Sequence, residues 1–187
     1  MKKWLFKPFV YIAGIRALLA GLGIILITAF IAIFSHTHFD GTLDAHFGAD
    51  TSLAYSLLEP LSDWLCLVIP LYIIGRIISE SSVRFIDIAG TTALARWPLL
   101  PVALIGFISV PHINPNASLH QLIQTALAPA VIIQALLALP FIVWYIALLY
   151  NAFSVSANVK GGKAAASFIA SLVIAEIISK VIFISLF

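Results

Sequence analysis

Charged residues are scarce in this chain. Only 10% of its 187 residues are Asp, Glu, Lys or Arg, whereas 62% are hydrophobic and the mean hydropathy is +1.11. Soluble domains carry roughly 25% charged residues. A water-soluble protein of this length could not bury so much apolar surface, so we expect lipid to be its solvent. The formal net charge of +2 is too small to indicate a nucleic-acid partner.

Cysteine is nearly absent, and the common catalytic motifs are missing. Cys66 is the only cysteine, which excludes an intramolecular disulfide. The chain contains no G-x-S-x-G nucleophile elbow, no nucleotide-binding glycine motif and no HExxH zinc motif. We therefore expect a protein that is not an enzyme and that carries no cofactor.

Apolar runs long enough to cross a bilayer are what the sequence has in abundance. They predict one all-α domain over residues 1–187, a multi-pass membrane helix bundle with five transmembrane helices, because a backbone in lipid must satisfy its own hydrogen bonds. The expected spans are approximately 17–34, 61–78, 97–110, 126–150 and 164–187. The third is short unless it begins near residue 86.

Basic residues alternate with the connections between these spans. They occur before the first span and in the second and fourth connections, whereas 35–60 and 111–125 contain no Lys or Arg. The positive-inside rule then predicts a cytoplasmic N-terminus and a C-terminus outside, in the inner (cytoplasmic) membrane. The basic residues of the inner connections either contact anionic lipid headgroups or only set the orientation. They are Arg76, Arg84, Arg96, Lys160 and Lys163.

Two stretches in the second half are the most distinctive parts of the sequence. They are IDIAGTTALARWPLLP at 86–101 and WYIALLYNAFSVSANVKGGKAAASFIASLVIAEIISK at 144–180. Together they resemble the Ypt-interacting protein (Yip) domain family of integral membrane proteins, in a compact bacterial form. The resemblance covers most of the chain and implies five membrane helices with the same orientation. Eukaryotic members carry a long cytoplasmic region and engage small GTPases, but this chain has only a short N-terminal tail.

The resemblance implies a non-catalytic membrane protein that organises the membrane or partner proteins through helix–helix contacts. Its partners would be the lipid bilayer, other membrane proteins or further copies of itself. The alternative is a small transporter or channel that uses an intramembrane polar pair. A third reading is a metal-binding protein or metal-dependent membrane enzyme that uses histidines of the outer loops.

The polar pair is Glu176 and Lys180, four residues apart on one face of the last expected span. A charge at the centre of a bilayer costs roughly 2.5–3.5 kcal/mol on insertion scales, so this face should point into the bundle. It serves either as a proton, ion or headgroup site, or as a structural anchor between helices, with Lys180 reaching toward the interface.

Small residues recur every four positions on two of the expected helices. This spacing allows another helix to approach closely, so we expect both stripes to be packing faces. They are Ser167, Ser171, Ala175 and Ser179 in the last span, and Ala13, Ala17 and Gly21 at the first.

All five histidines fall in the two expected outer loops. Histidine and carboxylate are zinc ligands, but their spacing here matches no established ligand pattern. The alternatives are a polar loop at the headgroup boundary and a pH-sensing loop. The candidate ligands are His36, His38 and His46 in the first outer loop, and His112 and His120 in the third connection.

Overall fold

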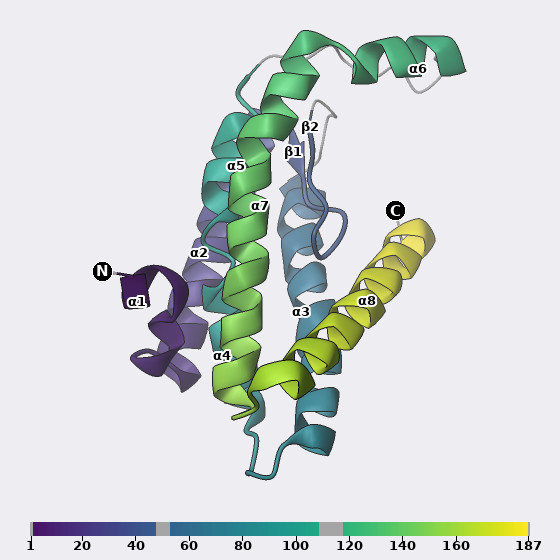
Figure 1. The fold of residues 1–187 in the computed structure, drawn as a ribbon. Helices are drawn as coiled ribbons and strands as arrows, with labels where there is room; N and C mark the ends of the chain where they lie inside the picture. Colours follow the sequence, from purple (N-terminus) through teal and green to yellow (C-terminus); the bar gives the residue numbers. More distant parts are fainter. Residues whose placement is uncertain (1, 48–52, 109–117, 187) are drawn as a thin grey trace.

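The computed structural model describes residues 2–47, 53–108 and 118–186, and these are predominantly helical (Figure 1). Five helical segments are long and apolar enough to cross a membrane, as the hydropathy predicts. The segments are α2 (Gly14–Ser35), α3 (Leu53–Ile78), α4 with α5 (Phe85–Ile105), α7 (Pro129–Ser156) and α8 (Gly161–Leu186). The chain is therefore built as a multi-pass membrane protein.

Five shorter elements lie outside the described membrane-spanning segments. A first turn of helix α1 (Lys2–Phe6) and a 3-10 turn η1 (Pro8–Val10) precede α2. Two short strands, β1 (Thr37–His38) and β2 (His46–Phe47), pair antiparallel after α2. Helix α6 (Leu119–Ala126) lies across one end of α7 (Figure 1). The strands lie toward the same end of the bundle as α6.

The third span is longer than the 97–110 run and begins near residue 86, as its length requires. It consists of α4 (Phe85–Leu94) and α5 (Leu99–Ile105), which are joined by a turn. Pro98 lacks a backbone N–H, so the regular α-helical ladder cannot continue through it. Tighter bonds take its place: the Arg96 N–H donates to Ala93 O at 3.2 Å, and the Leu99 N–H donates to Arg96 O at 2.9 Å.

Small residues allow α2 and α4 to cross with their backbones in contact. Ala17 and Gly21 are buried on α2, opposite Gly90 and Ala93 on α4. A Cβ atom at Gly21 would collide with the Ala93 backbone, and one at Gly90 would collide with Gly14 O. The stripe predicted in the first helix lies at this crossing. Ala13 does not take part, because it is exposed and precedes the first residue of the helix.

The stripe on α8 faces α3, against which α8 mainly packs. Ser171, Ala175 and Ser179 are fully buried, and Ser167 is half-buried. The two buried serines satisfy their hydroxyls locally: Ser171 Oγ donates to Ser167 O at 2.8 Å, and Ser179 Oγ donates to Glu176 O at 3.0 Å. The helix thus presents few unpaired polar groups to its neighbour.

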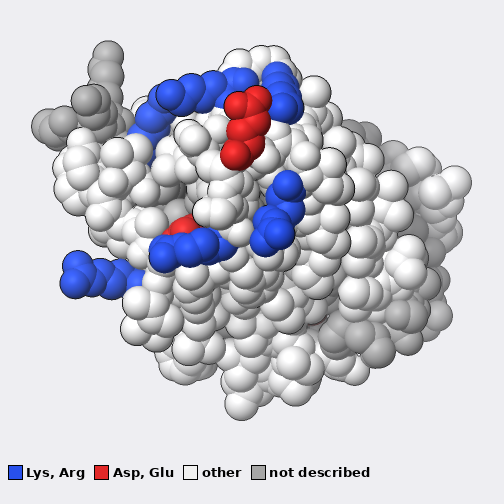
Figure 2. All heavy atoms as spheres, turned by 90° about the horizontal axis from the view of Figure 1, so that it is seen from below, with Lys and Arg blue, Asp and Glu red and all other residues white. Residues whose placement is uncertain are grey.

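Exposed basic residues gather at one end of the bundle, which we call the basic end (Figure 2). This end is formed by the α3–α4 and α7–α8 connections, and it carries Arg76, Arg84, Lys160 and Lys163. Arg96 does not belong to this set. It lies in the turn between α4 and α5 and is 2% exposed, so the prediction of a headgroup contact at Arg96 is wrong. The third span runs from Phe85 to Ile105, so it includes Arg96 and places it inside the bundle and not in a connection.

Candidate functional site

The opposite end of the bundle is closed by a folded loop, residues 36–47, which we call the hairpin loop. His36 adopts a left-handed conformation (φ 49°) that ends α2 and reverses the chain. Thr37 then pairs with Phe47, and His38 pairs with His46. Inside the loop Phe39 is 2% exposed and Thr42 is buried. The loop therefore packs down onto the bundle and has a small hydrophobic anchor of its own.

Helix α3 holds the start of the hairpin loop through Glu59. One carboxylate oxygen of Glu59 lies 3.0 Å from His38 Nδ1, and the other accepts a hydrogen bond from the Phe39 N–H at 3.4 Å. Glu59 is almost fully buried. Its two oxygens thus satisfy both a side chain and a backbone group of the loop.

Helix α8 holds the middle of the hairpin loop through Glu176 and Lys180. Glu176 Oε2 accepts a hydrogen bond from the Leu43 N–H at 3.2 Å, and Lys180 Nζ donates to Asp44 Oδ2 at 2.6 Å. A Cβ atom at Gly41 would lie 2.8 Å from Glu176 Oε1, so glycine permits this close approach. The predicted polar pair therefore has partners in the hairpin loop.

Acidic and basic side chains cluster on the hairpin loop itself. His46 Nδ1 lies 2.8 Å from Asp40 Oδ1, His46 Nε2 lies 4.0 Å from Asp44 Oδ1, and Lys180 Nζ lies 3.7 Å from Asp40 Oδ2. The hydrogen bond to Asp40 raises the pKa of His46 above its ordinary value, although burial opposes it. Burial raises the pKa of Asp40, but the bond and charge of His46, with the charge of Lys180, outweigh it and lower the pKa overall.

Among the described residues, the predicted ligands His36, His38, His46 and His120 form no shared group of metal-ligand type. His38 is bound to Glu59, and His120 Nε2 lies 3.0 Å from the Gln124 amide nitrogen on α6. His112 lies outside the described residues. The one cluster of metal-ligand type in the described part of the chain is Asp40, Asp44 and His46. Of the predicted histidines that are described, His46 is the one that belongs to this cluster.

A second polar centre lies inside the bundle, below the hairpin loop. Asp63, one helical turn after Glu59 on α3, is 0% exposed. Neither of its carboxylate oxygens has a hydrogen-bond partner among the described residues. Arg96 lies within electrostatic reach of Asp63 but forms no ion pair with it in the described structure, and Glu59 and Glu176 act on it with like charge.

Arg96 approaches this centre from the turn in the third span. Its guanidinium donates to the Tyr145 hydroxyl at 3.4 Å and lies 5.8 Å from the centre of that ring. Tyr145 on α7 is fully buried. Three spans thus contribute one polar side chain each: Asp63 from α3, Arg96 from the α4–α5 turn and Tyr145 from α7.

Two prolines and one interhelical turn lie near the Asp63 centre. Pro60 and Pro70 lie inside α3 on either side of Asp63, and Arg96 lies in the turn that interrupts the third span. Prolines remove backbone hydrogen bonds and make helices bend there. Sequence reasoning missed this centre because Asp63 seemed to mark a span boundary and Arg96 seemed to belong to a loop. An acid inside an apolar run was the available signal.

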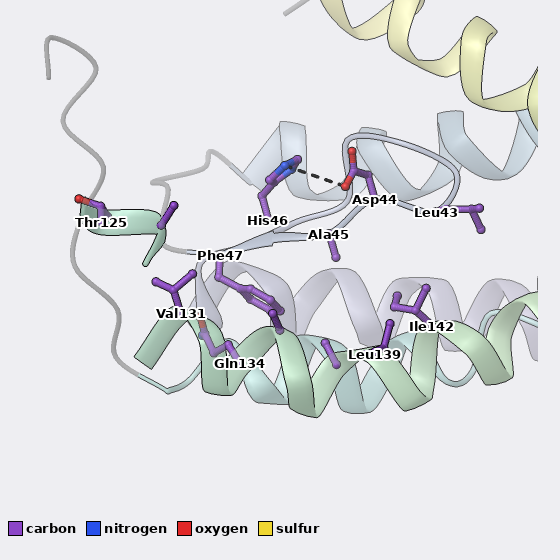
Figure 3. A pocket seen from close by; sticks show the side chains of 13 residues that line it. Leu43, Asp44, Ala45, His46, Phe47, Thr125, Val131, Gln134, Leu139 and Ile142 are labelled. Carbon is purple, nitrogen blue, oxygen red and sulfur yellow. Dashed lines mark ion pairs between the residues drawn. The ribbon is translucent and has the colours of Figure 1, made fainter. Parts of the chain in front are cut away.

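A pocket of about 380 Å³ lies between the hairpin loop and α7 (Figure 3). Leu43, Ala45 and Phe47 of the loop face it, and Gln134 lines it from α7. Gln134 is 1% exposed and donates to Ile105 O at 3.3 Å and to Ile108 O at 3.0 Å. The pocket is separate from the Asp63 centre in its lining residues.

Comparisons with known proteins add no identity to this geometry. No family model, curated protein or solved structure matches the chain. The Yip resemblance therefore stays a prediction. The structure shows a multi-pass helical membrane protein whose apolar core contains a few buried polar side chains.

Proposed function

We propose that this chain is a small, non-catalytic membrane transporter that binds a proton or a small monovalent cation at Asp63. The observation that carries this proposal is the pair of Asp63 carboxylate oxygens, fully buried and without hydrogen-bond partners among the described residues. An ionised carboxylate left unpaired in a low-dielectric interior is costly enough that it acquires a proton or a cation. Intramembrane acids of this kind mark proton and ion pathways.

The surroundings of Asp63 favour reversible binding. Glu59 and Glu176 add negative charge near Asp63, which attracts a cation. Arg96 adds one positive charge; its guanidinium donates to the Tyr145 hydroxyl and makes no hydrogen bond to Asp63 in the described part of the chain. Transporters commonly place such sites where membrane helices are interrupted. Here Pro60 and Pro70 lie in α3 on either side of Asp63, and the α4–α5 turn interrupts the third span.

A liposome flux assay tests the proposal. Proteoliposomes of the full chain, loaded with a pH-sensitive or a sodium- or potassium-sensitive dye, should show flux above protein-free liposomes under an imposed gradient. Asp63→Asn should abolish this flux, since an amide binds neither a proton nor a cation tightly. Glu80→Gln is the matched control, because Glu80 is exposed near the basic end. Wild-type flux equal to that of empty liposomes, or undiminished flux in Asp63→Asn, contradicts the proposal.

A role as an organiser of membrane partners, the function that the Yip resemblance implies, is the second candidate. It is favoured by the large apolar side chains that α7 exposes along its length, among them Ile133, Leu136 and Val143. A photoreactive residue at Leu136 should capture a partner of defined mass in native membranes, whereas the same residue at buried Leu148 should not. Labelling of lipid alone at Leu136 would remove support for this candidate.

We propose that the chain lies in the cytoplasmic membrane with its N-terminus inside and its C-terminus outside. The gathering of basic residues at one end of the bundle supports this orientation. In a Cys66→Ala background, Ser118→Cys should react with an impermeant thiol reagent added to intact cells, and Ser82→Cys should react only after lysis. Both serines are exposed and lie at opposite ends of the bundle. The reverse labelling pattern would overturn the orientation.

A further inference from the structure

The hairpin loop forms one wall of the pocket beside α7. Residues 43–47 all line it, and Ala45 and Phe47 point toward α7 whereas Asp44 and His46 point away from it (Figure 3). The charged residues of the hairpin loop are therefore directed to the cluster with Lys180. The pocket receives the hydrophobic side of the same loop.

Helix α7 provides the opposite wall, and its small residues leave the space open. Ala135 and Ala138 line the pocket between Val131 and Leu139. Next to them Leu136 and Leu137 are exposed on the outer side of α7, which faces lipid in a membrane-spanning chain. The pocket therefore lies beside the lipid-facing side of α7, and its volume falls within the range of ligand pockets, about 300–1,000 Å³.

One polar group in the pocket wall has no partner. The Gln134 amide nitrogen donates to two carbonyl groups, Ile105 O and Ile108 O, which fixes the orientation of the amide. Its oxygen Oε1 is buried and has no hydrogen-bond partner among the described residues. A buried acceptor of this kind normally binds a donor, so its place in the wall of a mostly apolar pocket points to a ligand with an O–H group.

We propose that this pocket binds the acyl chain of a single-chain lipid whose free hydroxyl donates to Gln134 Oε1. The mostly apolar walls and the position beside the lipid-facing side of α7 select an acyl chain, and the unpartnered oxygen selects a hydroxyl near the interfacial end of that chain. Gln134 lies five residues after the start of α7, close to the membrane boundary. Amphipathic helix α6 contributes Thr125 and Ala126 to the rim, at the level where lipid headgroups lie. This site does not depend on the Asp63 proposal.

Photolabelling with a defined lipid tests the site. The probe is a lysophosphatidylcholine with a diazirine in its acyl chain, added to the full chain in phosphatidylcholine nanodiscs. Mass spectrometry should locate the label on 43–47 and 131–142. Ala138→Phe should fill the pocket and remove this label, whereas Leu136→Phe, on the lipid-facing side, should retain it. Gln134→Leu should weaken binding about threefold to tenfold, the expected effect of one lost neutral hydrogen bond.

Each outcome decides the inference. Label spread evenly over the lipid-facing residues of α7, with no loss in Ala138→Phe, overturns the proposal. Crosslinked dimers that join this pocket to another copy of the chain would show that it is a self-association surface, and would also overturn the proposed lipid binding. Undiminished binding in Gln134→Leu refutes the hydroxyl contact. Thermal unfolding of each variant is measured in parallel, so that a loss of label counts only in a variant with the wild-type transition.

Discussion

The crossing of α2 and α4 makes a sharp prediction about two glycines in one helix. Gly21 and Gly23 both lie in α2, two residues apart. A Cβ atom added at Gly21 meets the backbone of Ala93 and Leu94, whereas one added at Gly23 has nothing within 4 Å. The substitutions Gly21→Ala and Gly23→Ala therefore make the same chemical change in different surroundings.

The magnitude follows from two opposing terms. Alanine in place of glycine favours a helix by about 1 kcal/mol, and this gain is shared by both variants. At Gly21 the clash is with backbone atoms that cannot rotate away, so the helices must separate, at a cost of about 1–3 kcal/mol for overpacking. The free energies of unfolding should thus differ by about 1–3 kcal/mol, with Gly21→Ala the less stable protein.

Reversible unfolding in mixed micelles measures this difference, because the helix-propensity gain cancels between the two variants. Titration with a denaturing detergent should shift the Gly21→Ala midpoint to lower concentration and leave Gly23→Ala at or above wild type. Equal free energies of unfolding for the two variants would refute the close α2–α4 contact. A double variant with Gly90→Ala should lose further stability, since Gly90 lies at the same crossing.

Two more predictions concern the hairpin loop. Glu176→Ala removes the acceptor of the Leu43 N–H, so hydrogen exchange at this amide should rise by about tenfold. Glu176→Gln should have an intermediate effect. Unchanged exchange in Glu176→Ala would contradict the role of Glu176 in holding the loop. The His46–Asp40 contact should protect the loop most between about pH 4 and pH 6.5. The raised pKa of His46 gives stability that is complete below 6.5 and fades as the pH rises through the folded value. The lowered pKa of Asp40 gives stability that is present above 3.8 and is lost as the pH falls. Amide hydrogen exchange of the hairpin loop, measured against pH, should be slowest in this pH range. In His46→Gln the exchange rate should no longer depend on pH near neutrality. The effect should be small, because His46 is largely exposed.

Local patterns accounted for the helices but not for their polar contacts. The hydropathy runs predict five spans, and proline at residue 98 explains why the third continues through a turn. The pairing of Glu176 and Lys180 with the hairpin loop joins residues more than 130 positions apart. Spacing along one helix could show that these two residues share a face, but it could not show which element would meet that face.

The sequence by itself determined the solvent of this protein, its helical class and the uneven distribution of its basic residues, because composition and local hydropathy set these properties. Only the tertiary structure decided which polar groups find partners. It placed Arg96 inside the bundle, used Glu59 and Glu176 to hold the hairpin loop, and left Asp63 buried without a partner among the described residues. These outcomes depend on how bent helices cross, and such long-range geometry is not encoded in any short stretch of the chain.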